Sequence, residues 1–196
     1  ACGVAMHTAT AQLNVDIVSA GGAQVIDIGV GIHHAAVSVG FLGDSGRVTC
    51  TLVSSQVNIA SRLTGLTKHY GVTILVSDAA FKHVTQQASR GGGDGDEEEF
   101  DATCCRRIGY ICPKGATKLV GIVEVFQTDD LLLKEHKMRT KAKFEKAVRL
   151  RSKGQMPAAR RLLEEVQATA AEWRLVDAVV ELKLCHENPI EEFAAK

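Results

Sequence analysis

Hydrophobic residues along the chain follow two patterns, one typical of strands and one typical of helices. Runs rich in β-branched residues predict strands within residues 24–43, 48–54, 72–77, 106–112 and 119–128. Segments with helical spacing or helix-tolerant composition lie between them and predict helices at 5–19, 56–70 and 77–87. Strands and helices interspersed in this way indicate an α+β fold. We expect the strands within 24–43 to be buried, because β-branched and small residues alternate there.

A glycine-rich, acidic segment, RGGGDGDEEEFDA, interrupts this pattern at residues 90–102. Its composition is similar to that of some calcium-binding loops, but it lacks their regular ligand spacing. We therefore interpret it as a flexible loop between two elements.

The pattern changes again after Thr128, where strand formers become rare and lysine and arginine become frequent. Two helical stripes follow, one of Phe144, Ala147, Val148 and Arg151 and one of Ala158, Leu162 and Val166. Gly154 and Pro157 lie between the two stripes and separate the two helices. Proline suits the first turn of a helix, so Pro157 indicates the start of the second one. We predict two domains, residues 1–128 and a helical tail at 129–196, the tail being a helical hairpin of the tetratricopeptide kind.

Composition excludes several classes of partner. The 23 basic residues balance the 23 acidic ones, so no global field favours nucleic acid or an anionic membrane. No apolar run approaches the ~20 residues of a membrane span, and no secretory signal is visible. None of the six cysteines forms a Cys-x-x-Cys pair, which favours reduced thiols in a cytoplasmic protein. Because the chain opens with Ala1 rather than Met, we expect a piece of a longer protein, which could itself be attached to a membrane.

The helix predicted at residues 56–70 carries the candidate chemistry. Its core stripe is formed by Ile59, Leu63, Leu66 and Tyr70. Asn58 and Arg62 share the adjacent border, four residues apart, so an amide and a guanidinium project together. On spacing alone, the simpler interpretation of Asn58 and Arg62 is that they are ordinary polar residues at the border of a buried helix face. A glycine turn (GFLGDSG), a strand directly before the helix and a basic tip (CPKGATK) favour an anion-binding site instead.

The residues around this helix resemble a known family. The segment IGVGIHHAAVSVGFLGDSGRVTCTLVSSQVNIASRLTGLTKHYGVTILVS is similar to the catalytic domain of class III nucleotidyl (adenylate/guanylate) cyclases. That family has G-I-x-I-H-x-G, V-x-x-G-x-x-G, V-N-x-A-x-R-L and I-L-V-S in this order. RRIGYICPKGATKLVGIVEVFQ resembles its closing strands, so the likeness spans about residues 24–127. The implied fold is ferredoxin-like, a mostly antiparallel sheet with packed helices, with the N-terminal part absent.

The resemblance implies a reaction and residues to carry it. In the family the ribose 3′-hydroxyl attacks the α-phosphate of ATP or GTP, and pyrophosphate leaves. Asn58 matches the asparagine that orients the ribose, and Arg62 matches the arginine that stabilises the phosphoryl charge. Lys114 matches the lysine on the terminal phosphates, and Thr51 matches the base-selecting residue. Two aspartates hold Mg²⁺ or Mn²⁺ in the family, upstream of anything here, so the chain is expected to contain no metal ligands.

Some positions depart from the family pattern. Asp16 and Asp27 do not match the metal aspartates. His34-Ala35-Ala36 replaces Thr-Gly-Pro, and Ser54-Ser55 replaces Gly-Asp, which would strain the turn if Ser54 had a positive φ. His33 matches the family's usual histidine, interpreted as structural.

Two functions remain open. One is a purine nucleotide cyclase, active as a homodimer or as a heterodimer with a second cyclase domain. The alternative is a catalytically inactive cyclase-like regulatory or dimerisation domain.

Overall fold

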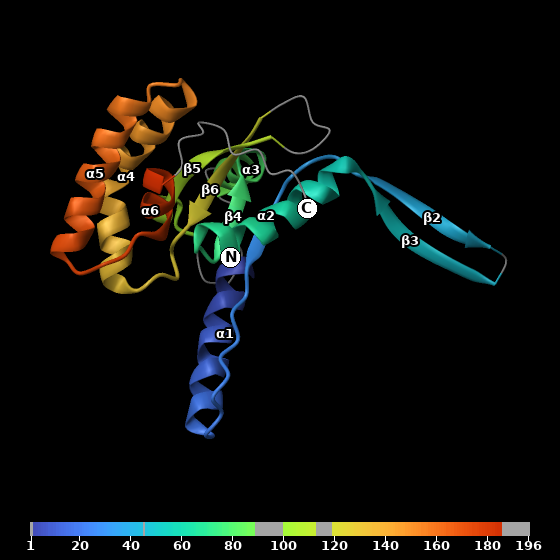
Figure 1. Cartoon of the computed structure of the whole chain (residues 1–196). Coiled ribbons are helices and arrows are strands. Elements are labelled where there is room, and N and C mark those ends of the chain that lie inside the picture. Colours follow the sequence, from blue (N-terminus) through green and yellow to red (C-terminus); the bar gives the residue numbers. More distant parts are fainter. Residues whose placement is uncertain (1, 45, 89–99, 113–118, 186–196) are drawn as a thin grey trace.

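The computed structural model of the protein describes residues 2–44, 46–88, 100–112 and 119–185 (Figure 1). It is an α+β structure, as the sequence predicts, and its main sheet is mixed. The elements in chain order are α1 (Cys2–Ser19), β1 (Val30–Ile32), β2 (Ser38–Asp44), β3 (Arg47–Val53), α2 (Ser55–Tyr70), β4 (Ile74–Ser77), α3 (Asp78–Ala88), the 3₁₀ helix η1 (Ala102–Cys104), β5 (Cys105–Ile111), β6 (Val120–Val125), α4 (Leu131–Ser152), α5 (Met156–Glu172) and α6 (Ala178–Cys185). Most of the acidic loop predicted at 90–102 lies outside the described residues. In the described part of the chain, no helix is both long and apolar enough to cross a membrane.

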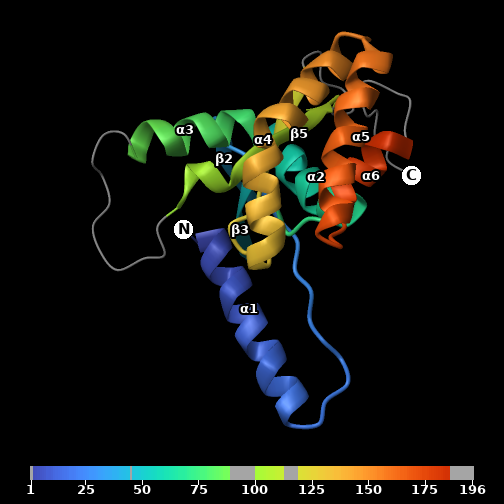
Figure 2. The same cartoon turned by 90° about the vertical axis from the view of Figure 1, so that its left-hand side faces the viewer.

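The main sheet has four strands in the order β1-β4-β6-β5. β1 runs parallel to β4, and β6 pairs antiparallel with both β4 and β5. Successive side chains of a strand point to opposite faces, so each strand contributes side chains to the layers on both faces of the sheet. Leu75 and Ile122 face α2 and the tail helices, whereas Val76 and Val123 face α3 and the first turn of α1. The rest of α1 projects from the body (Figures 1 and 2), and only Val4 of this helix is buried.

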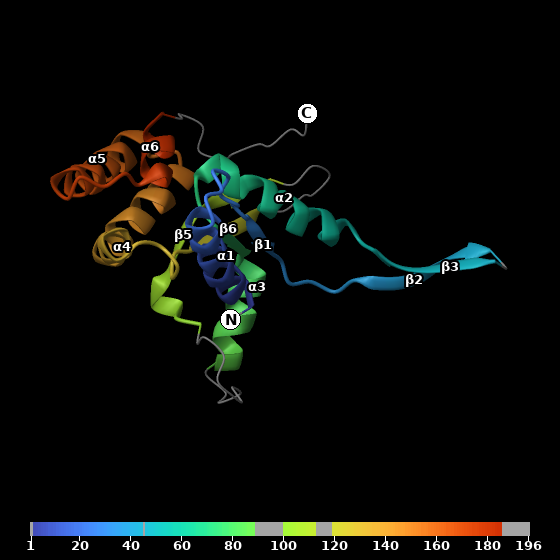
Figure 3. The same ribbon diagram turned by 90° about the horizontal axis from the view of Figure 1, so that it is seen from below.

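Strands β2 and β3 form a separate hairpin that projects away from the body (Figures 1 and 3). The expectation of buried strands within 24–43 is therefore wrong for β2. It is also wrong for β1, whose residues are all at least partly exposed. Residues directly opposite each other in an antiparallel pair share a face, and one face of the hairpin gathers apolar side chains that are all exposed. These are Val39, Phe41, Val48, Cys50 and Leu52. The residue pattern identified a strand, but it carried no information on whether another layer covers it.

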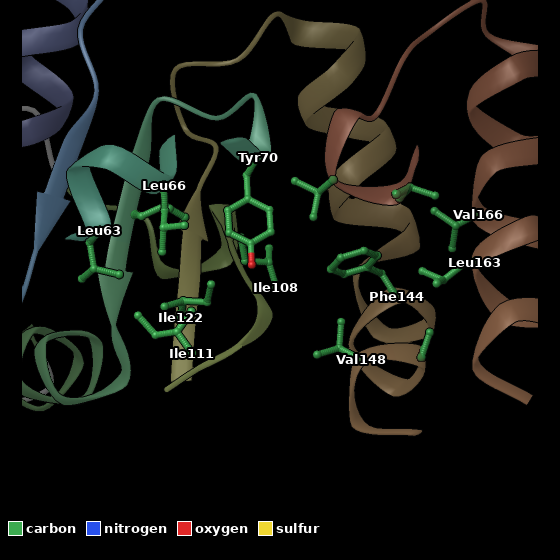
Figure 4. Close-up of a cluster of buried hydrophobic side chains, with 14 of the residues drawn as sticks. Leu63, Leu66, Tyr70, Ile108, Ile111, Ile122, Phe144, Val148, Leu163 and Val166 are labelled. Carbon is green, nitrogen blue, oxygen red and sulfur yellow. The ribbon is translucent and has the colours of Figure 1, made fainter. Parts of the chain in front are cut away.

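The tail helices pack directly on the sheet (Figure 2). Figure 4 shows the shared core, in which Tyr70 of α2 and Ile108 of β5 lie beside Phe144 of α4 and Leu163 of α5. Both parts of the chain therefore bury side chains in one cluster, while the division at 128/129 stays a prediction, as does the tetratricopeptide likeness.

The stripe predicted on α4 is buried: Phe144, Ala147, Val148 and Arg151. The stripe predicted on α5 is wrong by one residue, because Ala159 and Leu163 are buried in place of Ala158 and Leu162. The buried set runs Ala159, Leu163, Val166, Ala170, a spacing of four, three and four. That spacing follows a 3.6-residue turn better than the spacing of four that was predicted.

Candidate functional site on helix α2

Helix α2 has a defined start and a defined end. Ser54 caps it with an extended backbone, φ −166°, and its Oγ accepts a hydrogen bond from the backbone N of Gln56 at 3.1 Å. The strain expected if Ser54 had a positive φ is therefore absent. Gly71 ends the helix in the left-handed conformation, φ 63°, which glycine adopts at little cost.

The predicted core stripe of α2 is confirmed: Ile59, Leu63, Leu66 and Tyr70 are buried. The helix lies very close to β1, since a Cβ on Gly31 would stand 2.3 Å from the backbone N of Thr64. This close approach fixes which side of α2 meets the sheet. It follows that the border with Asn58 and Arg62 stays accessible.

Asn58 is exposed and Arg62 is partly exposed, about one helical turn apart. Within residues 2–44, 46–88, 100–112 and 119–185, neither side chain has a hydrogen bond or an ion pair. The fold thus leaves an amide and a guanidinium free to contact a ligand. An arginine fork suits an anion such as phosphate.

A histidine joins the start of α2 to the sheet. His33 directly follows β1, and its Nδ1 lies 2.8 Å from Oγ of Ser77, the last residue of β4. Its Nε2 lies 3.0 Å from Oε1 of Gln56, in the first turn of α2. Ser77 is fully buried and its Oγ also accepts a hydrogen bond from the backbone N of Ala80 at 3.3 Å, which caps α3. The imidazole therefore connects two parallel strand ends with the two helices that begin there.

The other predicted site residues lie elsewhere or outside the described part. Thr51 is on the hairpin, opposite Gly40 and partly exposed. Lys114 lies outside the described residues. The structure thus brings Asn58 and Arg62 together and places Thr51 on a different element.

The described residues do not fit a metal site. They contain no group of three or more histidine, cysteine, aspartate or glutamate side chains that could hold a metal ion. Asp16 is exposed on α1, where it accepts a hydrogen bond from Gln12, and Asp27 is exposed before β1. No catalytic step is therefore assigned to a metal held by these residues.

A second polar cluster, which the sequence did not predict, is buried between the sheet and the tail. Arg106 of β5 donates from Nε to Glu124 of β6 at 2.6 Å. Lys137 of α4 donates to Glu124 at 2.6 Å and to Asp129 at 2.5 Å. Burial opposes the charged form of Lys137. The negative charge of Glu124 outweighs this effect and raises the pKa of Lys137. The only sequence signal was an arginine and a glutamate inside strands that otherwise read as buried.

Comparison with known proteins finds partial similarity to adenylate cyclases. The chain is 38% identical to the adenylate cyclase of Anabaena cylindrica over 60 residues, which are 31% of this chain and 12% of that protein. It is 43% identical to adenylate cyclase 1 of Rhizobium meliloti (strain 1021) over 49 residues, 25% of this chain and 7% of that protein. The matches thus cover a small part of these relatives. No family model matches the chain, and no solved structure matches it. These findings indicate a relationship to nucleotide cyclases.

Proposed function

We propose that this chain supplies the nucleotide-contacting residues of a class III purine nucleotide cyclase. The reaction converts ATP or GTP to the cyclic 3′,5′-monophosphate and pyrophosphate. The observation that carries the proposal is the pair Asn58 and Arg62, held one turn apart on an accessible border of α2 without partners in the described structure. The partial similarity to adenylate cyclases supports the same assignment.

Each residue has a role that suits its chemistry. Arg62 stabilises the charge that develops on the transferring phosphoryl group, since its planar fork stays charged and contacts two oxygens. Asn58 orients the ribose, Lys114 contacts the terminal phosphates, and the hydroxyl of Thr51 contacts the base. Mg²⁺ or Mn²⁺ would neutralise the triphosphate when bound, with ligands outside this chain.

We further propose that the site is completed in a dimer, with a second copy as the partner. The apolar face of the hairpin supports this proposal, because an isolated two-stranded hairpin is marginally stable in water. Phe41 and Val48 on this face are 75% and 67% exposed. Two identical hairpins would cover each other's apolar faces in a symmetric contact.

The test is cyclic-nucleotide production by the full-length protein with ATP or GTP and Mn²⁺. Arg62→Ala should lower turnover on the order of 10²-fold or more, as loss of a transition-state contact does. Arg62→Lys keeps the charge but not the fork and should recover only part of the rate. Arg161→Ala is the matched control, because Arg161 is exposed on α5, away from this helix.

Turnover that is unchanged in Arg62→Ala would overturn the assigned role. A folded wild-type dimer that makes neither cyclic nucleotide would contradict the enzyme proposal. That outcome would favour the alternative, a catalytically inactive cyclase-like regulatory or dimerisation domain.

A further inference from the structure

The position of His33 follows from the register of two parallel strands. Ile32 of β1 pairs with Val76 of β4, so the next residues along, His33 and Ser77, stand side by side where both strands end. Helix α2 begins at the same edge of the sheet, which brings Gln56 within reach of the imidazole.

The available donors and acceptors fix the direction of each hydrogen bond. Oε1 of Gln56 can only accept, so Nε2 of His33 carries the proton and donates. In a neutral imidazole Nδ1 then accepts, and the hydroxyl of Ser77 donates to it. The Oγ of Ser77 can still accept a hydrogen bond from the backbone N of Ala80. A single tautomer of His33 is therefore consistent with the hydrogen bonds of His33, Gln56 and Ser77.

The first turn of α2 depends on such outside contacts. The first backbone N–H groups of a helix have no partner within it, so this end frays easily. Ser54 satisfies one of them, and the side chain of Gln56 is tied to His33. Asn58 follows Gln56 by two residues and lies in the same turn.

We propose that His33 is a positioning residue, which holds the first turn of α2 through Gln56 and so sets where Asn58 and Arg62 stand. The inference rests on the proposed cyclase function for its catalytic consequence, though not for the contact itself. Small displacements of a side chain that orients a reacting group cost much of the rate. His33 itself needs no contact with the nucleotide.

Two conservative variants separate this role from simple stabilisation of the fold. In His33→Gln the amide nitrogen can reach the place of Nε2 and keep the contact with Gln56. In His33→Asn the amide oxygen can reach the place of Nδ1 and keep the contact with Ser77 alone. If His33 positions α2, His33→Gln should behave like the wild type and His33→Asn should not. If His33 acted only through Ser77 and the cap of α3, His33→Asn should behave like the wild type and His33→Gln should not.

The first readout is hydrogen exchange at the backbone amides of residues 58–60 in the 196-residue chain. Loss of one hydrogen bond should speed their exchange up to about tenfold in His33→Asn. His33→Gln should change it less than about threefold. Long-range proton–nitrogen spectra should show Nε2 of His33 protonated and Nδ1 unprotonated. Equal exchange in the two variants, or the opposite tautomer, would overturn the inference.

The second readout is turnover by the full-length protein. In His33→Asn kcat should fall about tenfold with a smaller change in KM, because the displaced groups act on the transition state. In His33→Gln kcat should stay within about threefold of the wild type. If the wild type makes no cyclic nucleotide, the proposed function fails and the exchange experiment alone decides on His33. If the wild type is active and both variants match it, His33 does not position the site.

Discussion

Arg106 and Asp177 form a bidentate ion pair that joins strand β5 to the start of helix α6. Nη1 and Nη2 of Arg106 donate to the two carboxylate oxygens of Asp177 at 2.6 and 2.8 Å. The two side chains are 0% and 1% exposed, so water screens the pair very little. Burial opposes the charged carboxylate, yet Arg106 lowers the pKa of Asp177 to about 2. The tail is thus held to the sheet by charge as well as by apolar packing.

Removing one partner of this pair should strongly destabilise the protein. In Asp177→Ala the buried guanidinium keeps Glu124 but loses both contacts to Asp177. Loss of one partner of a buried pair costs about 3–5 kcal/mol in the free energy of unfolding. Urea unfolding of the two proteins measures the difference.

The control for Asp177→Ala is Glu164→Ala, which breaks the exposed pair of Arg160 and Glu164 on one helix face. Exposed pairs contribute about 0.5 kcal/mol or less. If the two variants lost the same stability, the buried pair would not hold the tail.

Lys183 of α6 should make stability rise with pH above neutrality. Burial, with smaller contributions from the charges of Arg151 and Arg106, lowers its pKa from 10.5 to about 7. Between these two values the unfolded chain binds the proton and the folded chain does not. The free energy of unfolding therefore rises with pH across this window, by up to about 1.4 kcal/mol per pH unit.

Lys183→Met should remove this rise and stabilise the protein at pH 7, as judged by urea unfolding at pH 7, 8 and 9. Lys146→Met is the matched control, because Lys146 is exposed on α4. Parallel pH curves for wild type and Lys183→Met would contradict the assigned pKa.

Local signals explain why α2 could be predicted from the sequence. Ile59, Leu63, Leu66 and Tyr70 mark its buried face, and Gly71 marks its end. These signals lie within one stretch of chain and need no knowledge of distant residues. The border position of Asn58 and Arg62 follows from them directly.

Contacts between distant segments explain what the sequence did not predict. Asp177 lies 71 residues from Arg106, and His33 lies 44 residues from Ser77. Each partner looks ordinary in its own segment, since Arg106 sits in a strand and Asp177 precedes a short helix. The exposed hairpin was missed for a similar reason, because burial depends on which layer covers a strand.

Two glycines offer a test of how closely α2 lies on the sheet. In Gly31→Ala the new Cβ would stand 2.3 Å from the backbone N of Thr64 and 2.7 Å from the carbonyl oxygen of Ala60. The helix backbone must move, and we expect a loss of about 1–3 kcal/mol in the free energy of unfolding.

Gly65→Ala is the matched control for Gly31→Ala, since Gly65 lies within α2 with open space around it. A glycine-to-alanine change inside a helix stabilises it by about 0.5–1 kcal/mol. Urea unfolding should therefore give opposite signs for the two variants. A stabilised Gly31→Ala would show that α2 does not approach β1 this closely.

The apolar face of the hairpin yields a prediction about assembly. Phe41→Glu places a charge at the centre of this face, next to its cross-strand partner Cys50. Burying that charge in a contact between two hairpins is costly, so the proposed dimer should dissociate. Phe41 is 75% exposed, so the free energy of unfolding of the isolated chain should hardly change.

Thr49→Glu adds the same charge on the opposite face of the hairpin and should leave the proposed dimer intact. Sedimentation of the three proteins over a range of concentrations measures their association. A wild type that stays monomeric, or two variants that associate equally well, would show that this face does not join two copies. Dissociation in Phe41→Glu alone would place the contact on the face that carries Phe41 and Leu52.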